Sequence, residues 1–289
     1  MDDVTGKVAF ITGGASGMGL AMARSFSAAG MKVVIADIED GSLEAVANEF
    51  AATNADVLTL KVDVTDRDAM EQAAQATEEA FGKVHVVVNN AGVAVGGGVS
   101  DMTYEDWDWV MKVNLDGVVN GVQTFINRIL AHGEGGHIIN TASMAGHMAI
   151  PGLSVYNTTK YAVVGLSEAI RQDLAGKDIG VSVLCPGIVN TGIFDSGRNR
   201  PEELTGDRDT ASMVLSDAES EAEREARFAE MIEDALDPAV VGDMVLDAVL
   251  NNDQYIFTHP NFVAITDARN AEIHASFERW AKYREDHGV

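Results

Sequence analysis

The chain has 289 residues, of which 46% are apolar and 22% are charged, a composition that excludes a disordered chain and allows one large buried core. Its formal net charge of −25 opposes binding to nucleic acid or to an anionic membrane, because both need basic surfaces. No apolar run is long enough to span a bilayer, and the acidic start of the chain is unlike a signal peptide.

Cysteine and histidine usage argues against a disulfide and against a metal site. The single cysteine, Cys185, lies in an apolar run and is expected to be a small buried side chain rather than a nucleophile. A chain with no intrachain disulfide fits a reducing, cytoplasmic setting. The seven histidines have no ligand-like spacing and form no Cys/His cluster, so we expect no metal ion.

Short apolar runs alternate with longer amphipathic stretches along the chain. The predicted strands are Lys7–Thr12, Lys32–Asp37, Val57–Val62, Val84–Asn89, His137–Thr141, Val181–Cys185 and Tyr255–Thr258. The predicted helices are Gly19–Ala29, Gly41–Ala52, Asp66–Phe81, Tyr104–Ala131, Ser154–Ala175 and Pro238–Leu250. Most of these strands are nearly continuous in Val, Ile and Leu, as in strands covered on both faces. The alternation predicts an α/β fold, with residues 1–289 forming a single doubly wound domain around a seven-stranded parallel sheet flanked by helices.

The stretch from about 192 to 237 interrupts this alternation. Between Asp195 and Asp237 the chain carries 14 acidic and 5 basic residues. Its second half has helical spacing of apolar residues, namely Phe228, Met231, Ile232 and Leu236. The stretch follows the strand that ends near Pro186, at the sheet edge where open α/β folds bind ligands. We therefore expect a mobile substrate lid, with an ordinary surface insertion as the alternative.

The C-terminal extension, from about residue 259 to 289, shows apolar residues at rough helical spacing. These residues are Ile265, Ile273, Phe277 and Trp280. Such a pattern is typical of a helix that packs on the body or contacts another subunit rather than of a ligand site.

Residues Thr12–Gly19 read T-G-G-A-S-G-M-G, directly between the first predicted strand and the first predicted helix. Glycines such as Gly13, Gly17 and Gly19 let the backbone turn tightly and approach a phosphate. The helix that follows points its free N–H groups at the anion. In this context the segment predicts a pyrophosphate site of a dinucleotide.

Asp37 ends the second predicted strand and indicates which dinucleotide binds. A carboxylate there can accept both adenosine-ribose hydroxyls and repels a 2′-phosphate. The next residues, Ile38-Glu39-Asp40, contain no cation that would favour a 2′-phosphate. We therefore predict NAD rather than NADP, with a role of Asp37 as a helix cap as the alternative.

Tyr156 and Lys160 are four residues apart on a predicted helix and so share one face. A nearby ammonium group stabilises a phenolate and lowers the tyrosine pKa from its ordinary value of about 10. Ser143 follows a predicted strand and emerges at the same sheet edge, where it can hydrogen-bond a substrate oxygen. The three residues predict proton transfer coupled to hydride transfer on an alcohol or ketone.

Seven motifs in the same order and spacing resemble those of the short-chain dehydrogenase/reductase family. They are T-G-G-A-S-G-M-G at Thr12–Gly19, Asp63-Val64, N-N-A-G at Asn89–Gly92, Asn114, Ser143, Y-N-T-T-K at Tyr156–Lys160, and P-G-I-V-N-T at Pro186–Thr191. The resemblance covers the chain except the lid and the C-terminal extension, and it implies Asn114, Ser143, Tyr156 and Lys160 as catalytic residues. It implies Asn114 as the holder of a helix kink and of a water that relays protons from Lys160.

The resemblance also implies a set of cofactor-binding residues that reaches from the adenine to the nicotinamide. They are Gly13, Ser16, Gly17, Met18, Gly19, Asp37, Ile38, Asp63, Val64, Asn90, Ala91, Gly92, Tyr156, Lys160, Pro186, Gly187, Ile188 and Thr191. By the same resemblance the protein is expected to be a homodimer or homotetramer, paired through the helices Tyr104–Ala131 and Ser154–Ala175.

The expected substrate pocket is mostly apolar, which suits a bulky hydrophobic secondary alcohol or its ketone. Its candidate wall residues are Val93, Val95, Met144, Ala145, His147, Leu153, Ile193 and Phe194. The segments around Ser143 and Tyr156 are similar to a subgroup that oxidises the benzylic alcohol of lignin-derived β-aryl ethers. Steroid and cyclic alcohols stay open as substrates, as do an NAD-binding sensor or scaffold and an epimerase or dehydratase on the same fold.

Overall fold

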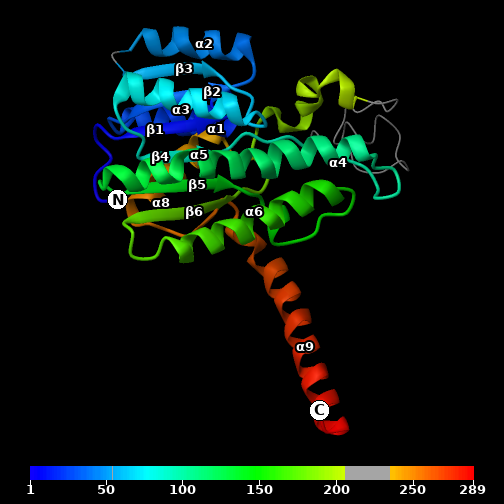
Figure 1. Ribbon diagram of the computed structural model, residues 1–289. Helices are drawn as coiled ribbons and strands as arrows, with labels where there is room; N and C mark the ends of the chain where they lie inside the picture. Colours follow the sequence, from blue (N-terminus) through cyan, green and yellow to red (C-terminus); the bar gives the residue numbers. More distant parts are fainter. Residues whose placement is uncertain (54, 206–234) are drawn as a thin grey trace.

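The computed structural model describes residues 1–53, 55–205 and 235–289, and a parallel sheet of seven strands lies at its centre (Figure 1). The strands are β1 (Val8–Thr12), β2 (Lys32–Asp37), β3 (Val57–Lys61), β4 (Val86–Asn89), β5 (Gly136–Thr141), β6 (Ile179–Cys185) and β7 (Tyr255–Phe257). Their order in the sheet is β3-β2-β1-β4-β5-β6-β7, and neighbouring strands are parallel. The predicted doubly wound, Rossmann-type α/β sheet is confirmed.

Helices cover both faces of this sheet. The helices of the body are α1 (Gly17–Ala28), α2 (Asp40–Ala51), α3 (Arg67–Phe81), α4 (Tyr104–Met111), α5 (Gly117–His132), α6 (Ser154–Asp173) and α8 (Pro238–Asn251). The last helix, α9 (Val263–His287), projects away from the sheet (Figure 1). Successive strand residues alternate between the faces: Ile11 packs in the cluster with α1, α2 and α8, whereas Phe10 packs in the cluster with α3 and α5. Because both faces are covered, the strands need apolar residues throughout, which is why their sequences lack a polar alternation.

The direction of chain winding reverses between β1 and β4. From β1 the chain builds outward to β2 and β3, then returns to add β4 on the other side of β1. Ile11 is the register partner of both Ile35 in β2 and Val88 in β4. The connections leave β1 and β4 in opposite directions, so a crevice opens at the carboxyl ends of these strands, where ligands of open α/β sheets bind.

The predicted helix Tyr104–Ala131 is two helices joined by a π-helical segment, Lys112–Asp116. Asn114 lies inside this segment and is buried. Its side-chain amide accepts a hydrogen bond from Val93 N at 2.8 Å and donates one to Val93 O at 2.9 Å. The side chain is thus fixed to the loop after β4, and the wider helical turn occurs where a functional residue is held, as is common for π segments.

The other elements begin and end within two residues of the predicted positions. Side-chain caps explain some of the starts. Asp66 accepts hydrogen bonds from Asp68 N and Ala69 N at the start of α3, and Thr103 and Asp106 form a capping box at the start of α4. In the part of the chain that the structure describes, no helix is long and apolar enough to cross a membrane.

The lid and the C-terminal extension differ from the body. Residues 192–204 form two short 3₁₀ helices, Gly192–Asn199 and Glu202–Leu204, while Phe228, Met231 and Ile232 of the predicted lid helix lie outside the described residues. Leu236 pairs with the strand extension after β6, where Leu236 N donates to Ile188 O at 3.0 Å. The C-terminal extension is helical as expected, but no residue of α9 is buried, so most of this helix does not pack on the described part of the chain.

Candidate active site

A cavity of about 820 Å³ lies at the carboxyl edge of the sheet and joins most of the predicted site residues. Among the predicted cofactor residues, all except Gly19 line this cavity, and Ser143, Tyr156 and Lys160 line it as well. Asn114 is fully buried behind the wall. The tertiary structure therefore brings together segments that are up to about 180 residues apart in the sequence.

The turn between β1 and α1 requires glycine because of its backbone conformation and its close packing. Gly13 and Gly17 have φ angles of +60° and +51°, which favour glycine. A Cβ at position 13 would come within 2.9 Å of the Ala91 Cα, and one at position 19 would overlap the Gly13 carbonyl oxygen. Gly19 thus acts from beneath the turn by allowing α1 to pack against it. The first turn of α1 then faces the cavity, as a pyrophosphate site requires.

Thr12 and Asn90 hold this turn against the end of β4. The Thr12 hydroxyl accepts hydrogen bonds from Asn90 N at 2.9 Å and Ala91 N at 3.1 Å, and donates one to Val88 O at 3.3 Å. The Asn90 side chain donates to the carbonyl oxygens of Thr12 and Gly13. These hydrogen bonds fix the turn before any ligand binds, so the turn is preorganised.

Asp37 lies at the end of β2 and is 9% exposed. Its two carboxylate oxygens accept hydrogen bonds from Ala15 N at 3.0 Å and Glu39 N at 3.1 Å. The N-cap of α2 is Glu39, so Asp37 does not occupy the cap position. A carboxylate has about four acceptor sites, so each oxygen retains capacity for a ribose hydroxyl while Asp37 also fixes the glycine turn.

Tyr156 and Lys160 project from the first turns of α6 into the cavity. The Lys160 ammonium group lies 5.3 Å from the centre of the Tyr156 ring, and it donates a hydrogen bond to Thr141 O at 2.9 Å. Ser143, just after β5, has its hydroxyl 3.4 Å from Pro186 O and accepts a hydrogen bond from Ala145 N at 3.1 Å. These contacts fix the orientation of all three polar side chains at one end of the cavity.

Burial changes the proton affinities of these groups. It lowers the pKa of Lys160 to about 8, because the charged ammonium group is poorly solvated. It also raises the pKa of Tyr156, and the hydrogen bond with Ser143 opposes that rise. In the chain without cofactor the environment of Tyr156 thus favours the neutral phenol, which differs from the expected lowering by Lys160.

The far end of the cavity is apolar, as expected for the substrate region. Of the predicted wall residues, Val93, Met144, Leu153, Ile193 and Phe194 line it. Val95, Ala145 and His147 lie outside this wall: Val95 packs against Trp109 and Val155, and Ala145 is fully buried. The His147 ring packs against Phe257 of β7, with Nε2 3.3 Å from Cys185 Sγ.

Sequence reasoning missed several wall residues that come from distant elements. They are Trp109 and Val113 on the α4 helix and its π segment, Met148 and Ile150 after Ser143, Arg198 and Asn199 in the lid, and Phe262 before α9. Helical spacing alone could have placed Trp109 and Val113 near Asn114. Phe262 lies in the extension that had been interpreted as a packing helix, and only the folded chain shows that this extension begins at the cavity.

The described part of the lid is held over the cavity at three points, and we call residues 192–204 the strap. Arg198 and Asn199 hydrogen-bond one Glu39 oxygen at 2.9 and 2.6 Å. The Ser196 hydroxyl exchanges two hydrogen bonds with the Ala94 backbone. The third anchor is a buried ion pair of 2.6 Å between Arg200 and Asp106 on α4, with the Arg200 guanidinium over the Trp109 ring.

The comparisons with known proteins agree with this geometry. The family model described as short chain dehydrogenase matches residues 7–202. The chain belongs to this family. It is 34% identical over 261 residues to a C alpha-dehydrogenase of Sphingobium, covering 90% of this chain and 83% of that protein. It is 32% identical over 275 residues to a CLA biosynthesis dehydrogenase/reductase of Lactiplantibacillus plantarum, covering 94% and 95%.

A solved structure is also similar over nearly the whole chain. It is a short-chain dehydrogenase/reductase from Burkholderia phymatum in complex with NAD, with a TM-score of 0.88 and 37% identity, covering 96% of this chain and 97% of that one. The predicted family resemblance is confirmed, and the protein is an oxidoreductase of the short-chain dehydrogenase family.

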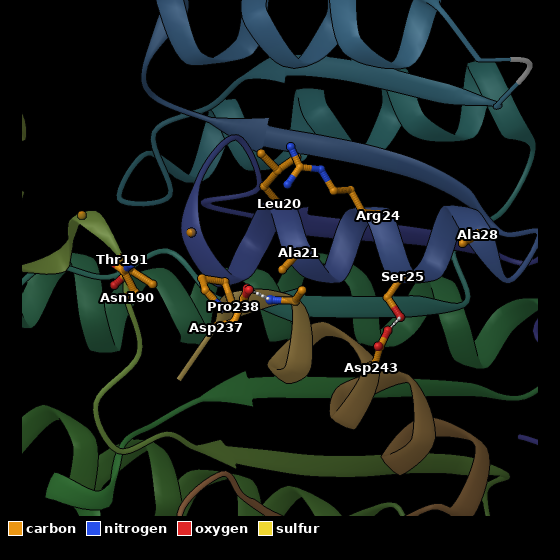
Figure 2. A pocket seen from close by; sticks show the side chains of 13 residues that line it. Leu20, Ala21, Arg24, Ser25, Ala28, Asn190, Thr191, Asp237, Pro238 and Asp243 are labelled. Atoms are coloured by element: carbon orange, nitrogen blue, oxygen red, sulfur yellow. Dashed lines mark hydrogen bonds between the residues drawn. The ribbon is translucent and has the colours of Figure 1, made fainter. Parts of the chain in front are cut away.

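This short-chain dehydrogenase has a second, more open cavity of about 580 Å³ between α1 and α8, behind the glycine turn (Figure 2). Its charged wall residues are already paired. Arg24 binds both oxygens of Glu49 at 2.7 Å, Asp243 accepts a hydrogen bond from Ser25 at 2.9 Å, and Asp237 caps α8. Arg24 is thus neutralised within the chain, and the other described charged groups of this wall are carboxylates.

Three potential metal ligands, His85, His132 and Glu134, lie within 4.8 Å of one another, although their sequence spacing had not indicated a site. His85 Nδ1 accepts a hydrogen bond from Val8 N, so its proton is on Nε2, which faces Glu134. His132 Nδ1 likewise accepts from Glu134 N, and its Nε2 faces the Val84 carbonyl oxygen. The lone pairs of both rings are used by backbone N–H groups, so the cluster does not fit a metal ion.

Proposed function

We propose that this short-chain dehydrogenase oxidises a hydrophobic, aromatic secondary alcohol to its ketone with NAD⁺ as the acceptor. The observation that carries the proposal is the position of Ser143, Tyr156 and Lys160 at one end of the cavity that also contains Asp37 and the glycine turn. This arrangement supports placing an alcohol carbon next to the nicotinamide of a cofactor whose adenosine end lies near Asp37.

The fit of NAD rests on the glycine turn and on Asp37. The turn at Gly13, Ser16, Gly17 and Met18 lines the cavity at the start of α1, and Asp37 retains acceptor sites that suit two ribose hydroxyls. A 2′-phosphate would meet the Asp37 carboxylate, with Glu39 nearby. When bound, NAD⁺ supplies the nicotinamide carbon that accepts the hydride.

The chain's own residues handle the proton. Tyr156 takes the proton of the substrate hydroxyl. At the same time the hydrogen on the alcohol carbon leaves with its bonding electron pair as hydride, and the carbon–oxygen bond becomes a carbonyl. The Ser143 hydroxyl orients the substrate oxygen, and the Lys160 ammonium group stabilises the phenolate. Asn114 is a positioning residue: its amide is used by Val93 and by the Thr159 hydroxyl, so it acts through the loop and helix that it joins.

The substrate class rests on the apolar end of the cavity and on one relative. Trp109, Phe194 and Phe262 give this end aromatic surfaces, and Met144 and Met148 add deformable ones. The relative from Sphingobium is named a C alpha-dehydrogenase. An aryl group beside the reacting carbon, as in lignin-type aryl ethers, would use these surfaces. Steroid and cyclic alcohols are the competing substrates.

The deciding experiment follows NADH formation from NAD⁺, with NADP⁺ in parallel, across lignin-type aryl ethers, aryl ethanols, steroids and cyclic alcohols. We expect NAD⁺-dependent oxidation of the aryl alcohols. Its rate should rise with pH, because burial raises the pKa of Tyr156 and oxidation needs the deprotonated phenol. A preference for NADP⁺ or for steroids would overturn that part of the proposal.

A Tyr156→Phe variant separates an enzyme from an NAD-binding sensor or scaffold. We expect turnover to fall at least about a hundredfold, while the dissociation constant for NADH stays within about threefold, since the phenylalanine ring keeps the packing. If the wild-type chain binds NADH tightly but oxidises none of these alcohols, the hypothesis of an NAD-binding sensor or scaffold replaces that of an alcohol dehydrogenase. Substrate conversion without net NADH formation would instead indicate an epimerase or dehydratase.

A further inference from the structure

α9 is the longest helix in the described chain, and none of its residues is buried. Its 25 residues extend about 37 Å at 1.5 Å per residue. Near its start Arg269 lies over the ring of Tyr161 in α6, 5.4 Å from the ring centre, and beyond this the helix leaves the body (Figure 1). The rest of the described chain therefore offers no surface that covers most of α9.

An apolar stripe runs along this free helix. Ile273, Phe277 and Trp280 are spaced by four and three residues, so their side chains share one face. Their exposed fractions are 39%, 72% and 53%. Helices in proteins owe most of their stability to packing of such a face, and contiguous exposed apolar surface marks an interaction site. The stripe therefore needs a partner surface.

We propose that the apolar stripe of α9 docks on a second copy of this chain, each subunit placing its C-terminal helix on the other. The part of α9 beyond Arg269, residues 270–287, is about 27 Å long and 10 Å across, so its lateral surface is about 850 Å², of which about half is covered when it lies on a partner. In a twofold dimer two such helices are buried at once. The total, counted on both sides, is about 1,700 Å², which matches the roughly 1,600 Å² of a standard stable interface.

The charge of α9 differs from that of the rest of the chain and permits docking on an acidic second copy. The whole chain carries −25, whereas α9 contains four basic and five acidic residues and is nearly neutral. The outer half of the helix is balanced as well: its three basic residues stand beside Glu278, Glu285 and Asp286. Lys282 binds Asp286 at 3.0 Å. A nearly neutral helix meets the acidic surface of a second copy with little repulsion. Nucleic acid or an anionic membrane would be repelled by the rest of the chain.

The helix is also connected to the substrate cavity. Phe262, which lines the cavity, directly precedes α9, and its ring stacks on His259 with 5.6 Å between ring centres. Docking of α9 on a second subunit would restrain the residue at its base. Assembly would thereby steady one wall of the substrate region.

The test compares the full chain with a double variant that places charges on the stripe, Phe277→Asp and Trp280→Asp. The matched control, Ala271→Asp and Ala275→Asp, adds the same charges on the opposite face of the helix. Sedimentation velocity gives the assembly state, and amide hydrogen exchange gives the protection of residues 273–283. NADH binding shows that each variant has a folded body.

We expect the wild-type chain to be oligomeric with α9 protected from exchange. The stripe variant should lose this protection and dissociate at least about tenfold more readily, whereas the control should match the wild type. A monomeric wild type, an oligomer with an unprotected α9, or equal effects of the two variants would overturn the proposal. Protection of α9 from exchange in a monomeric chain would also overturn the proposal, because the helix would then be covered by another partner or by another part of the same chain.

Discussion

The two ends of the active-site cavity are built in different ways. The cofactor end is made of backbone turns and short polar side chains from β1, β2 and β4, such as Thr12, Asp37 and Asn90, whose hydrogen bonds are nearly all local to those strand ends. The substrate end is made of large apolar side chains from α4, the strap and the base of α9, such as Trp109, Phe194 and Phe262. Local geometry therefore defines the cofactor, whereas packing between distant segments defines the substrate.

This difference predicts that mutations at the junction of the two ends have the largest effect. Lys160→Met removes the ammonium group that stabilises the Tyr156 phenolate, and we expect turnover to fall at least about a hundredfold. The same change removes a buried charge, so the cofactor-free chain should become more stable at pH 7 by up to about 3 kcal/mol. Thermal unfolding and steady-state rates measure both effects.

The stability gain should depend on pH in a defined direction. Burial lowers the pKa of Lys160 to about 8 in the folded chain from 10.5 in the unfolded chain. Between these values the unfolded chain binds more protons, so wild-type stability from this group rises with pH and the advantage of Lys160→Met shrinks above about pH 8. Lys177→Met, at an exposed lysine, is the control. A less stable Lys160→Met variant at pH 7 would contradict this account of the burial.

At the cofactor end, Asp37→Ala should raise the KM for NAD⁺ about tenfold or more while the KM for the alcohol changes little. The carboxylate is the proposed acceptor for the ribose hydroxyls and it also holds Ala15 N, so its loss should weaken recognition and loosen the glycine turn. Discrimination against NADP⁺ should fall as well. Asp40→Ala, at the exposed start of α2, serves as the control. If the preference for NAD⁺ over NADP⁺ is unchanged in Asp37→Ala, other residues determine the cofactor selectivity.

At the substrate end the pattern should reverse. Phe262→Ala removes an aromatic surface next to Gly187, and we expect the KM for the alcohol to rise by up to about tenfold, with the KM for NAD⁺ within about twofold. Val263→Ala shortens the next, exposed apolar residue and should have no such effect. If both variants weaken NAD⁺ rather than the alcohol, Phe262 does not belong to the substrate wall.

The smallest effect is expected where the strap meets the cofactor end. Glu39→Gln removes the negative charge that binds Arg198, although the Asn199 contact can persist, so NADH should dissociate only a few-fold faster. The hydrogen bond from Asn199 lowers the pKa of Glu39, so the contact is present above the ordinary carboxyl range and is lost only at lower pH. Stopped-flow release of NADH checks this, with Glu44→Gln as the control. An unchanged release rate would separate the strap from cofactor exchange.

The same contrast explains where sequence reasoning succeeded. The seven strands, most helix boundaries and the position of the glycine turn follow from patterns that span fewer than about twenty residues, because periodicity and glycine turns are local properties. Helix Tyr104–Ala131 is the exception: its spacing indicates one helix, and the π segment depends on the bond of Asn114 to Val93, which lies on another element.

The sequence by itself determined the α/β class, the parallel sheet and the family, since these depend on strand–helix alternation and on short motifs. Only the tertiary structure decided that Trp109 and Phe262 line the cavity, that Val95, Ala145 and His147 do not, and that α9 stands free of the body. The physical reason is that the neighbours of a side chain depend on how whole helices and strands pack together. The angle at which two elements pack, or the face that one presents to the other, leaves no pattern in the local sequence.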